Sequence, residues 1–132
     1  MKKNTIILTF GTFDVFHVGH LRILQRSAAL GDRLVVGISS DVLNISKKGR
    51  APIYSQEERM AIVAALRCVD AVFVEESLEK KREYLLAHRA DILVMGDDWT
   101  GKFDEFNDIC KVVYLPRTPA ISTTAVIEKI RS

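Results

Sequence analysis

Short apolar runs rich in β-branched residues alternate along the chain with longer segments whose apolar positions recur every three or four residues. The short runs predict five buried strands, over residues 5–10, 34–39, 71–74, 92–95 and 111–115. The longer segments predict helices over residues 18–30, from Ser55 onward, over 78–88 and over 123–130. Strands separated by helices of this size indicate βαβ units, so we expect an α/β fold with a five-stranded parallel sheet and helices on both faces.

Local signals refine three of these segments. Gly31 follows the first helical pattern at the position of a helix C-cap, and Ser55 with Glu58 forms a capping box at the start of the second. Residues 41–52 are polar and basic and have no apolar period, so they predict a loop. Neither an internal repeat nor a linker divides the chain, which predicts a single domain over residues 1–132.

Composition changes this picture mainly by exclusion. Hydrophobic residues make up 48% and charged residues 27%, as in ordinary globular domains, and a net charge of +2 argues against a dedicated nucleic-acid binder. The two cysteines, Cys68 and Cys110, lack CxxC spacing, so we expect them to be reduced and buried. The apolar runs are too short to span a bilayer and the chain start does not resemble a signal peptide, so no membrane partner and a cytoplasmic location are expected.

The segments that follow the predicted strands carry most of the chemically unusual residues. In an open parallel sheet, ligands bind at the carboxyl ends of the strands. Four segments follow such ends: residues 11–20, 40–50, 96–102 and 116–124. Candidate binding and catalytic residues are therefore expected in these four segments.

Two histidines follow the first strand. His17 and His20 are three residues apart, so they share one face of the first helical turn, where free backbone N–H groups favour an anion. Gly19 leaves room for a ligand to approach, and two imidazoles aimed at one phosphate could stabilise a phosphoryl-type transition state. One histidine could instead serve as a core or capping residue. A metal site with Asp14 is a weaker alternative, because Asp14 precedes the helix and no Cys or Glu completes the set.

The segment after the fourth strand matches part of the sequence pattern of a phosphate-binding loop. Residues 96–102 fit G-x-x-x-x-G-K, but Phe103 stands where Ser or Thr would hold magnesium, and two carboxylates would repel phosphate. Asp97, Asp98 and Trp99 better suit the task of holding a base or polyol and shielding it from water. The alternative for this tryptophan is a buried structural role.

Two further segments could bind phosphate. Lys47, Lys48 and Arg50 could close over a polyphosphate, although the same residues could form a solvated surface loop. Arg117 precedes three successive hydroxyls at residues 122–124, which exceeds what helix capping alone requires. A second phosphate site at this helix N-terminus is therefore a hypothesis beside simple capping.

Three of these segments together resemble a known family. His17-Val18-Gly19-His20 resembles the HxGH signature of the nucleotidyltransferase superfamily, and residues 117–124 resemble the RTxGISTT signature of its cytidylyltransferase family. With residues 94–104 between them, in the same order and at compatible spacing, the chain is most similar to bacterial glycerol-3-phosphate cytidylyltransferases. Pro119-Ala120 stands where the family usually has Glu-Gly.

The resemblance implies a reaction and its partners. It implies a Rossmann-like domain that binds CTP and a small phosphorylated alcohol, above all glycerol 3-phosphate, and that forms CDP-glycerol and pyrophosphate by in-line attack on the α-phosphate. It further implies Mg²⁺ as the ion, a homodimer, and a product used in teichoic acid, capsule or another surface polymer.

The resemblance also implies roles for particular residues. As catalytic residues it implies His17, His20, Lys47 and Arg117. As nucleotide-binding residues it implies Thr12, Phe13, Asp14, Gly19, Gly96, Asp98, Arg117, Thr118, Ser122 and Thr123. For the acceptor it implies Lys47, Arg67, Asp70 and Trp99, and it implies no protein ligand set for a metal.

Three alternatives stay open at this point. A cytidylyltransferase for another acceptor, such as ethanolamine phosphate, another polyol phosphate or a phosphonate, fits the same residues. An adenylyltransferase fits less well, because the last signature is that of the cytidylyl branch. A non-catalytic nucleotide-binding module would rarely need both His17 and His20.

Overall fold

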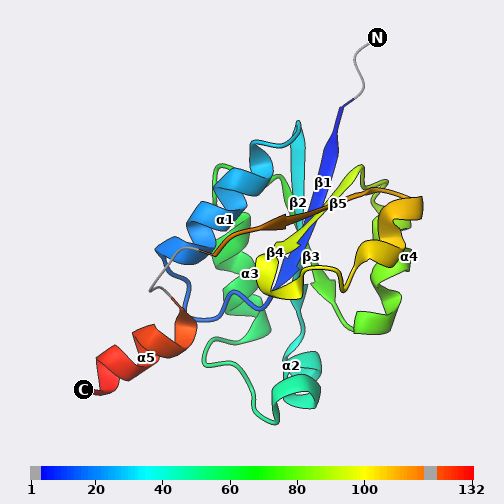
Figure 1. Ribbon diagram of the computed structural model, residues 1–132. Helices are drawn as coiled ribbons and strands as arrows, with labels where there is room; N and C mark the ends of the chain where they lie inside the picture. Colours follow the sequence, from blue (N-terminus) through cyan, green and yellow to red (C-terminus); the bar gives the residue numbers. More distant parts are fainter. Residues whose placement is uncertain (1–3, 118–121) are drawn as a thin grey trace.

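The computed structural model describes residues 4–117 and 122–132, and its centre is a parallel sheet in the order β3-β2-β1-β4-β5 (Figure 1). Every neighbouring pair of strands runs parallel. The strands are β1 (Ile6–Gly11), β2 (Arg33–Ser39), β3 (Ala71–Glu75), β4 (Ile92–Gly96) and β5 (Lys111–Leu115). The predicted α/β class with a five-stranded parallel sheet is therefore confirmed.

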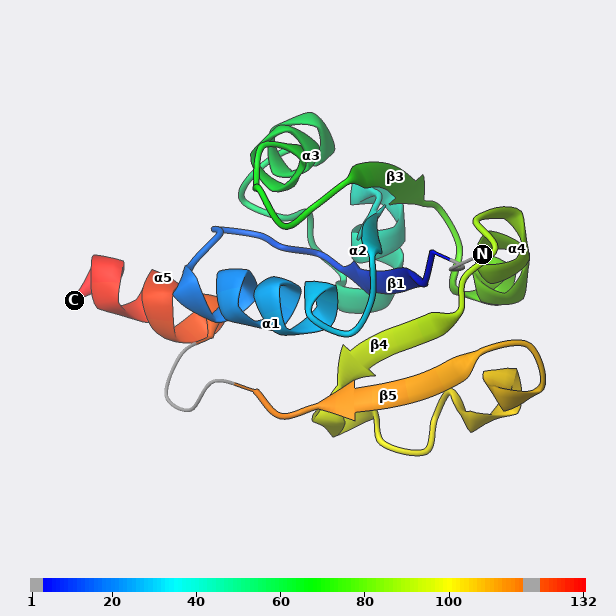
Figure 2. The same cartoon turned by 90° about the horizontal axis from the view of Figure 1, so that it is seen from above.

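Helices cover both faces of the sheet, as predicted. The helices are α1 (Val18–Ala28), α2 (Asp41–Lys48), α3 (Gln56–Ala64), α4 (Lys81–Ala87) and α5 (Thr123–Arg131), with short 3₁₀ turns η1 (Leu78–Lys80), η2 (Asp97–Trp99) and η3 (Asp104–Asp108). Because side chains alternate along a strand, Ile7 packs with α1 and α3 on one face while Leu8 packs with α4 and η3 on the other. Figure 2 shows α1 and α4 on opposite sides of the sheet.

The prediction of a loop over residues 41–52 is wrong for its first part, which forms helix α2. The Ser40 hydroxyl caps this helix by accepting the N–H of Leu43, and Gly49 ends it in the left-handed region at φ 75°. Leu43 and Asn44 are its buried residues. Of its apolar residues only Leu43 is buried, whereas Val42 and Ile45 are exposed, so the apolar positions do not follow the buried face.

Gly31 does not cap α1 either, because the helix ends at Ala28 with Ala29 as its C-cap. A Cβ added at Gly31 would lie 2.5 Å from Cδ1 of Ile7 and 2.8 Å from the carbonyl oxygen of Thr5. Glycine is therefore required here for the close approach of the chain to β1 rather than for the helix end.

The expectations drawn from composition are met in part. Cys68 and Cys110 are free and half-buried, and burial raises the pKa of both thiols, which keeps them protonated at neutral pH. Among the residues that the structure describes, no helix is both long enough and apolar enough to cross a membrane.

Candidate active site

The carboxyl ends of the central strands open into a cavity of about 660 Å³. The residues expected at a site that line it are Thr12, Phe13, Asp14, His17, Gly19, His20, Lys48, Arg50, Gly96, Asp98, Trp99, Arg117, Ser122, Thr123 and Thr124. Thr118 lies outside the described residues. The four segments that follow predicted strands thus meet at one place, as the strand-end rule requires.

The two histidines form a reciprocal cap at the start of α1. The N–H of Gly19 donates to Nδ1 of His17 at 3.1 Å, and the N–H of His17 donates to Nδ1 of His20 at 3.2 Å. The rings are stacked with their centroids 3.9 Å apart. Because each Nδ1 accepts a hydrogen bond, each ring is in the neutral tautomer that carries its proton on Nε2. The capping alternative and the catalytic hypothesis are therefore compatible.

Electrostatics also favour neutral imidazoles. Burial, with smaller contributions from His17 and Arg117, lowers the pKa of His20 to about 4, although Asp14 opposes the shift. Burial and then Arg117 lower the pKa of His17. At neutral pH the two rings are therefore uncharged N–H donors beside the cavity.

Helix α5 is joined to the histidine turn by a side-chain hydroxyl. Ser122 caps the helix by accepting the N–H of Ala125. The hydroxyl of Thr123 donates to the carbonyl oxygen of Asp14 at 3.0 Å and lies 3.5 Å from Nε2 of His17. One hydroxyl therefore serves as a cap, as the simpler alternative proposed, while its neighbour positions the histidine turn.

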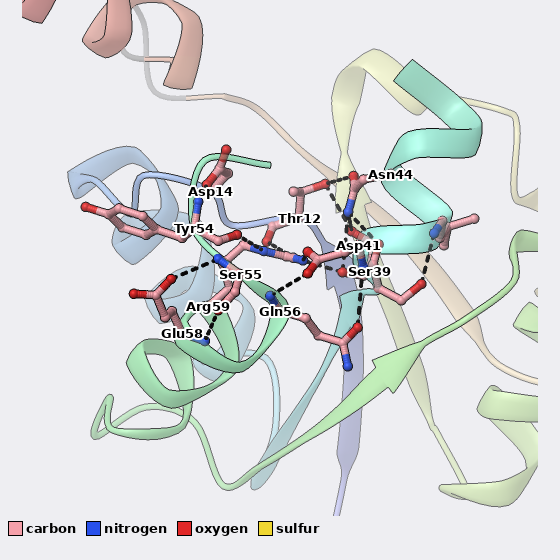
Figure 3. Close-up of polar contacts among 12 residues, drawn as sticks. Thr12, Asp14, Ser39, Asp41, Asn44, Tyr54, Ser55, Gln56, Glu58 and Arg59 are labelled. Carbon is pink, nitrogen blue, oxygen red and sulfur yellow. Dashed lines mark hydrogen bonds and ion pairs between the residues drawn. The ribbon is translucent and has the colours of Figure 1, made fainter. Parts of the chain in front are cut away.

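The carboxylate of Asp14 accepts hydrogen bonds from the backbone rather than binding a metal. It accepts the N–H groups of Ile53 and Tyr54, each at 2.8 Å, and that of Val15 at 3.0 Å. These bonds fix the segment that follows α2 beside the cavity. Figure 3 shows Asp14 beside Tyr54. Within residues 4–117 and 122–132 there is no group of three or more His, Cys, Asp or Glu side chains able to hold a metal, so the alternative of a metal site built on Asp14 has no support.

Trp99 and Asp98 lie at the end of β4. Trp99 is 42% exposed, which excludes a buried structural role, and its ring packs against Phe103 at 5.5 Å. Asp98 and Arg117 are both exposed, and their charged groups are 3.8 Å apart. The segment after Gly96 forms the short turn η2 rather than a phosphate-binding loop, as its sequence predicted.

The basic segment reaches the cavity through Lys48 and Arg50, whereas Lys47 is not part of the lining. Neighbouring residues of an α-helix point about 100° apart, so α2 directs only one of the two lysines to the cavity. Burial lowers the pKa of Lys47, and the nearby carboxylate of Glu75 opposes this shift. The structure therefore does not bring the implied catalytic Lys47 together with the histidines.

Arg67 and Asp70, which the resemblance assigned to the acceptor, lie at the opposite edge of the sheet. Asp70 directly precedes β3, where its carboxylate accepts the N–H of Leu34 at 2.8 Å and its own N–H donates to the carbonyl oxygen of Leu34. Leu34 is the second residue of β2 and pairs with Ile7 of β1, so this contact lies at the amino ends of the strands. The fold does not place either residue at the cavity.

This contact yields a prediction for stability. Changing Asp70 to Asn is expected to lower the free energy of unfolding by about 1–2 kcal/mol, because the buried N–H of Leu34 loses a charged acceptor. Urea denaturation measures the change. Asp108→Asn is the matched control, since its ion pair with Arg82 is exposed and should contribute less than about 1 kcal/mol. Equal losses in the two variants would contradict the structural role of Asp70.

Two residues that the sequence analysis missed are buried beside the cavity. Asn44 is 1% exposed, and its amide donates to the Ser39 hydroxyl, which donates to Thr12, which donates back to the Asn44 carbonyl oxygen. Arg59 is 0% exposed and contacts three other segments (Figure 3). Its spacing of four residues from buried Val63 places it on the apolar face of α3, which is the signal that could have found it.

Comparisons with known proteins identify the family to which this chain is similar. A family described as cytidylyltransferase-like matches residues 8–129. Glycerol-3-phosphate cytidylyltransferase of Bacillus subtilis (strain 168) is 48% identical over 130 residues, which cover 98% of either chain. The Staphylococcus aureus protein of the same name is 37% identical over 124 residues, covering 94% of this chain and 93% of that one.

A solved structure shows the same fold at lower identity. The lipopolysaccharide core biosynthesis protein from Thermoplasma volcanium GSS1 superimposes with a TM-score of 0.74, at 24% identity, covering 88% of this chain and 99% of that one.

Proposed function

Because the chain belongs to the cytidylyltransferase-like family, we propose that it transfers CMP from CTP to glycerol 3-phosphate and releases CDP-glycerol and pyrophosphate. The observation that carries the proposal is the stacked pair His17 and His20, two neutral N–H donors at a cavity large enough for a nucleotide. The near full-length relatives named for this reaction supply the choice of substrates.

The proposed step needs positioning and charge stabilisation but no base. A phosphate oxygen of glycerol 3-phosphate attacks the α-phosphorus of CTP, and the bond from that phosphorus to the oxygen bridging to the β-phosphate breaks. A phosphate monoester is already an anion at neutral pH, so no proton has to be removed. The Nε2–H groups of His17 and His20 would stabilise the charge that develops on the phosphoryl oxygens.

Charged and polar residues around this pair suit the rest of CTP. Arg117 and Ser122 lie beside α5, and Lys48 and Arg50 lie beside the segment after α2, so both groups can neutralise phosphates. Trp99 offers an aromatic face to the base or ribose, and Asp98 offers an acceptor for a hydroxyl or amino group.

The residues present fit magnesium carried by the nucleotide rather than a resident metal. Magnesium usually binds through one or two carboxylates, substrate phosphates and water. Asp14 is committed to three backbone N–H groups, and the other carboxylates among the described residues that line the cavity are those of Asp98 and Glu128. When bound, Mg²⁺ would neutralise charge on the triphosphate.

Pyrophosphate release tests the proposal. With CTP, Mg²⁺ and glycerol 3-phosphate the protein is expected to release pyrophosphate in amounts equal to CDP-glycerol, and ATP in place of CTP is expected to give at most a small fraction of that rate. A parallel screen with ethanolamine phosphate, other polyol phosphates and a phosphonate identifies another acceptor if there is one. Absence of turnover with every acceptor and either nucleotide, despite nucleotide binding, would favour the non-catalytic binding module instead.

Two implications of the resemblance, and the location expected from the sequence, stay predictions. The homodimer can be checked by analytical ultracentrifugation, and a cytoplasmic location by fractionation of the source cells. Use of the product in teichoic acid, capsule or another surface polymer requires tracing labelled CDP-glycerol.

A further inference from the structure

The turn that carries the histidine pair has an unfavourable backbone. Between β1 and α1, Phe13 has φ 54° and Val15 has φ 46°, in the left-handed region that bulky and β-branched residues rarely adopt. The turn ends at His17, whose ring and backbone begin the reciprocal cap. Such conformations persist when the surrounding structure fixes them, and they concentrate at functional sites.

The buried side chain of Arg59 holds this turn in place through hydrogen bonds. Its guanidinium donates through Nη1 to the carbonyl oxygens of Thr12 and Ser39, each at 2.8 Å, and through Nε to that of Tyr54 at 3.1 Å. Nη2 bonds the carboxylate of Asp41 at 2.7 Å. The Arg59 guanidinium is fully buried, and it is planar with N–H groups in fixed directions. It therefore holds its acceptors in a fixed arrangement.

Arg59 also holds the turn indirectly, through Tyr54 and Asp14. Arg59 holds the carbonyl oxygen of Tyr54, and the N–H of Tyr54 donates in turn to the carboxylate of Asp14. Arg59 therefore contacts the turn directly at Thr12 and, through Tyr54, at Asp14. Figure 3 shows Arg59 between the segment that ends β1, the start of α2 and the segment before α3.

We propose that Arg59 is a positioning residue for CMP transfer, which holds the strained turn over residues 12–16 so that the two imidazoles face the reacting phosphate. Arg59 is not part of the cavity lining, whereas Thr12 and Asp14 are, so it acts through them. The inference rests on the proposed function for its kinetic consequence, but its structural consequence can be measured without turnover.

The kinetic test compares Arg59→Lys with Val63→Ala. Lysine keeps the charge but cannot reach the carbonyl oxygens of Thr12 and Tyr54 together, so kcat is expected to fall at least tenfold while the KM for CTP changes less than threefold. Val63 is fully buried on the same helix but makes none of the hydrogen bonds that hold the turn, so Val63→Ala lowers the melting temperature and should keep kcat within twofold. A loss of kcat in both variants in proportion to their instability would overturn the positioning role.

A second readout follows the histidines directly. By NMR, the pKa of the His20 ring is expected to rise from its low value toward the ordinary value in Arg59→Lys, because the turn no longer keeps the ring buried, and to stay unchanged in Val63→Ala. An unchanged His20 titration in Arg59→Lys would overturn the inference even if no turnover is found. If the wild type releases no pyrophosphate but the His20 pKa still rises in Arg59→Lys, the result counts against the proposed function alone.

A third variant addresses the strain itself. Asparagine tolerates the left-handed region far better than valine, so Val15→Asn in the Arg59→Lys background should recover about tenfold in kcat. If Arg59→Lys is partly unfolded, trimethylamine N-oxide favours the compact state, and kcat is then expressed per folded molecule. A kcat per folded molecule equal to that of the wild type would contradict the proposal.

Discussion

Replacing His17 with asparagine is expected to lower kcat for CMP transfer by about 10²–10³-fold, with the KM for CTP nearly unchanged. Asparagine is a good N-cap residue, so its side-chain oxygen can still accept the N–H of Gly19 and α1 keeps its start. What is lost is the Nε2–H group, which acts when charge develops in the transition state. Steady-state pyrophosphate release measures both constants.

The chain offers a matched control for this variant. His88 is the third histidine of the chain, and it stacks on Phe73 with the ring centroids 4.3 Å apart, outside the cavity lining. His88→Asn makes the same chemical change and should leave kcat within twofold. If His17→Asn raised KM and spared kcat, the histidine would bind the ground state, and the proposed role in the transition state would be contradicted.

Changing Asp14 to asparagine is expected to lower kcat/KM for CTP by about 10²–10³-fold, because the backbone segment that this side chain holds would be released. The carboxylate accepts two short bonds from Ile53 and Tyr54, and charged hydrogen bonds of this kind contribute about 1.5–3 kcal/mol each. An amide can accept one of these N–H groups, but its own NH₂ would then face the other. The segment after α2 would detach from the cavity, and Arg50 would move with it.

Asp32→Asn separates this effect from loss of charge. Asp32 accepts the N–H of Thr5 at the amino edge of the sheet, so the substitution is chemically identical but distant from the cavity. It is expected to leave kcat/KM within twofold. A loss of kcat/KM in Asp32→Asn comparable with that in Asp14→Asn would show that general stability, rather than the held segment, governs the rate.

The elements that sequence reasoning predicted well are those with a strong local signal. The strands are runs of apolar, largely β-branched residues, and burial on both faces of a parallel sheet requires them to be continuous. The capping box of Ser55 and Glu58 is present as predicted, with both of its hydrogen bonds. Most of the cavity lining was also found, because strand ends in a parallel sheet converge.

The features that were missed depend on contacts between distant segments. Helix α2 is held by the Ser40 cap and by Asn44, whose three donor contacts are to residues 39 and 40. These polar contacts hold its buried face, while two of its apolar residues, Val42 and Ile45, are exposed. Arg59 is a residue type normally exposed, and its burial depends on carbonyl oxygens from three other segments. Asp70 matches a family pattern, but it directly precedes the strand predicted over residues 71–74, so the strand-end rule already placed it away from the ligand side of the sheet.

The neutral form of the two imidazoles also affects the release of pyrophosphate. Pyrophosphate leaves the reaction as a multiply charged anion, and a pair of imidazolium ions would attract it far more strongly than two uncharged N–H groups do. Arg117, whose charge also lowers the pKa of both rings, is exposed and already faces Asp98 at 3.8 Å. Weak retention of the departing anion favours rapid product release, which limits kcat in many enzymes.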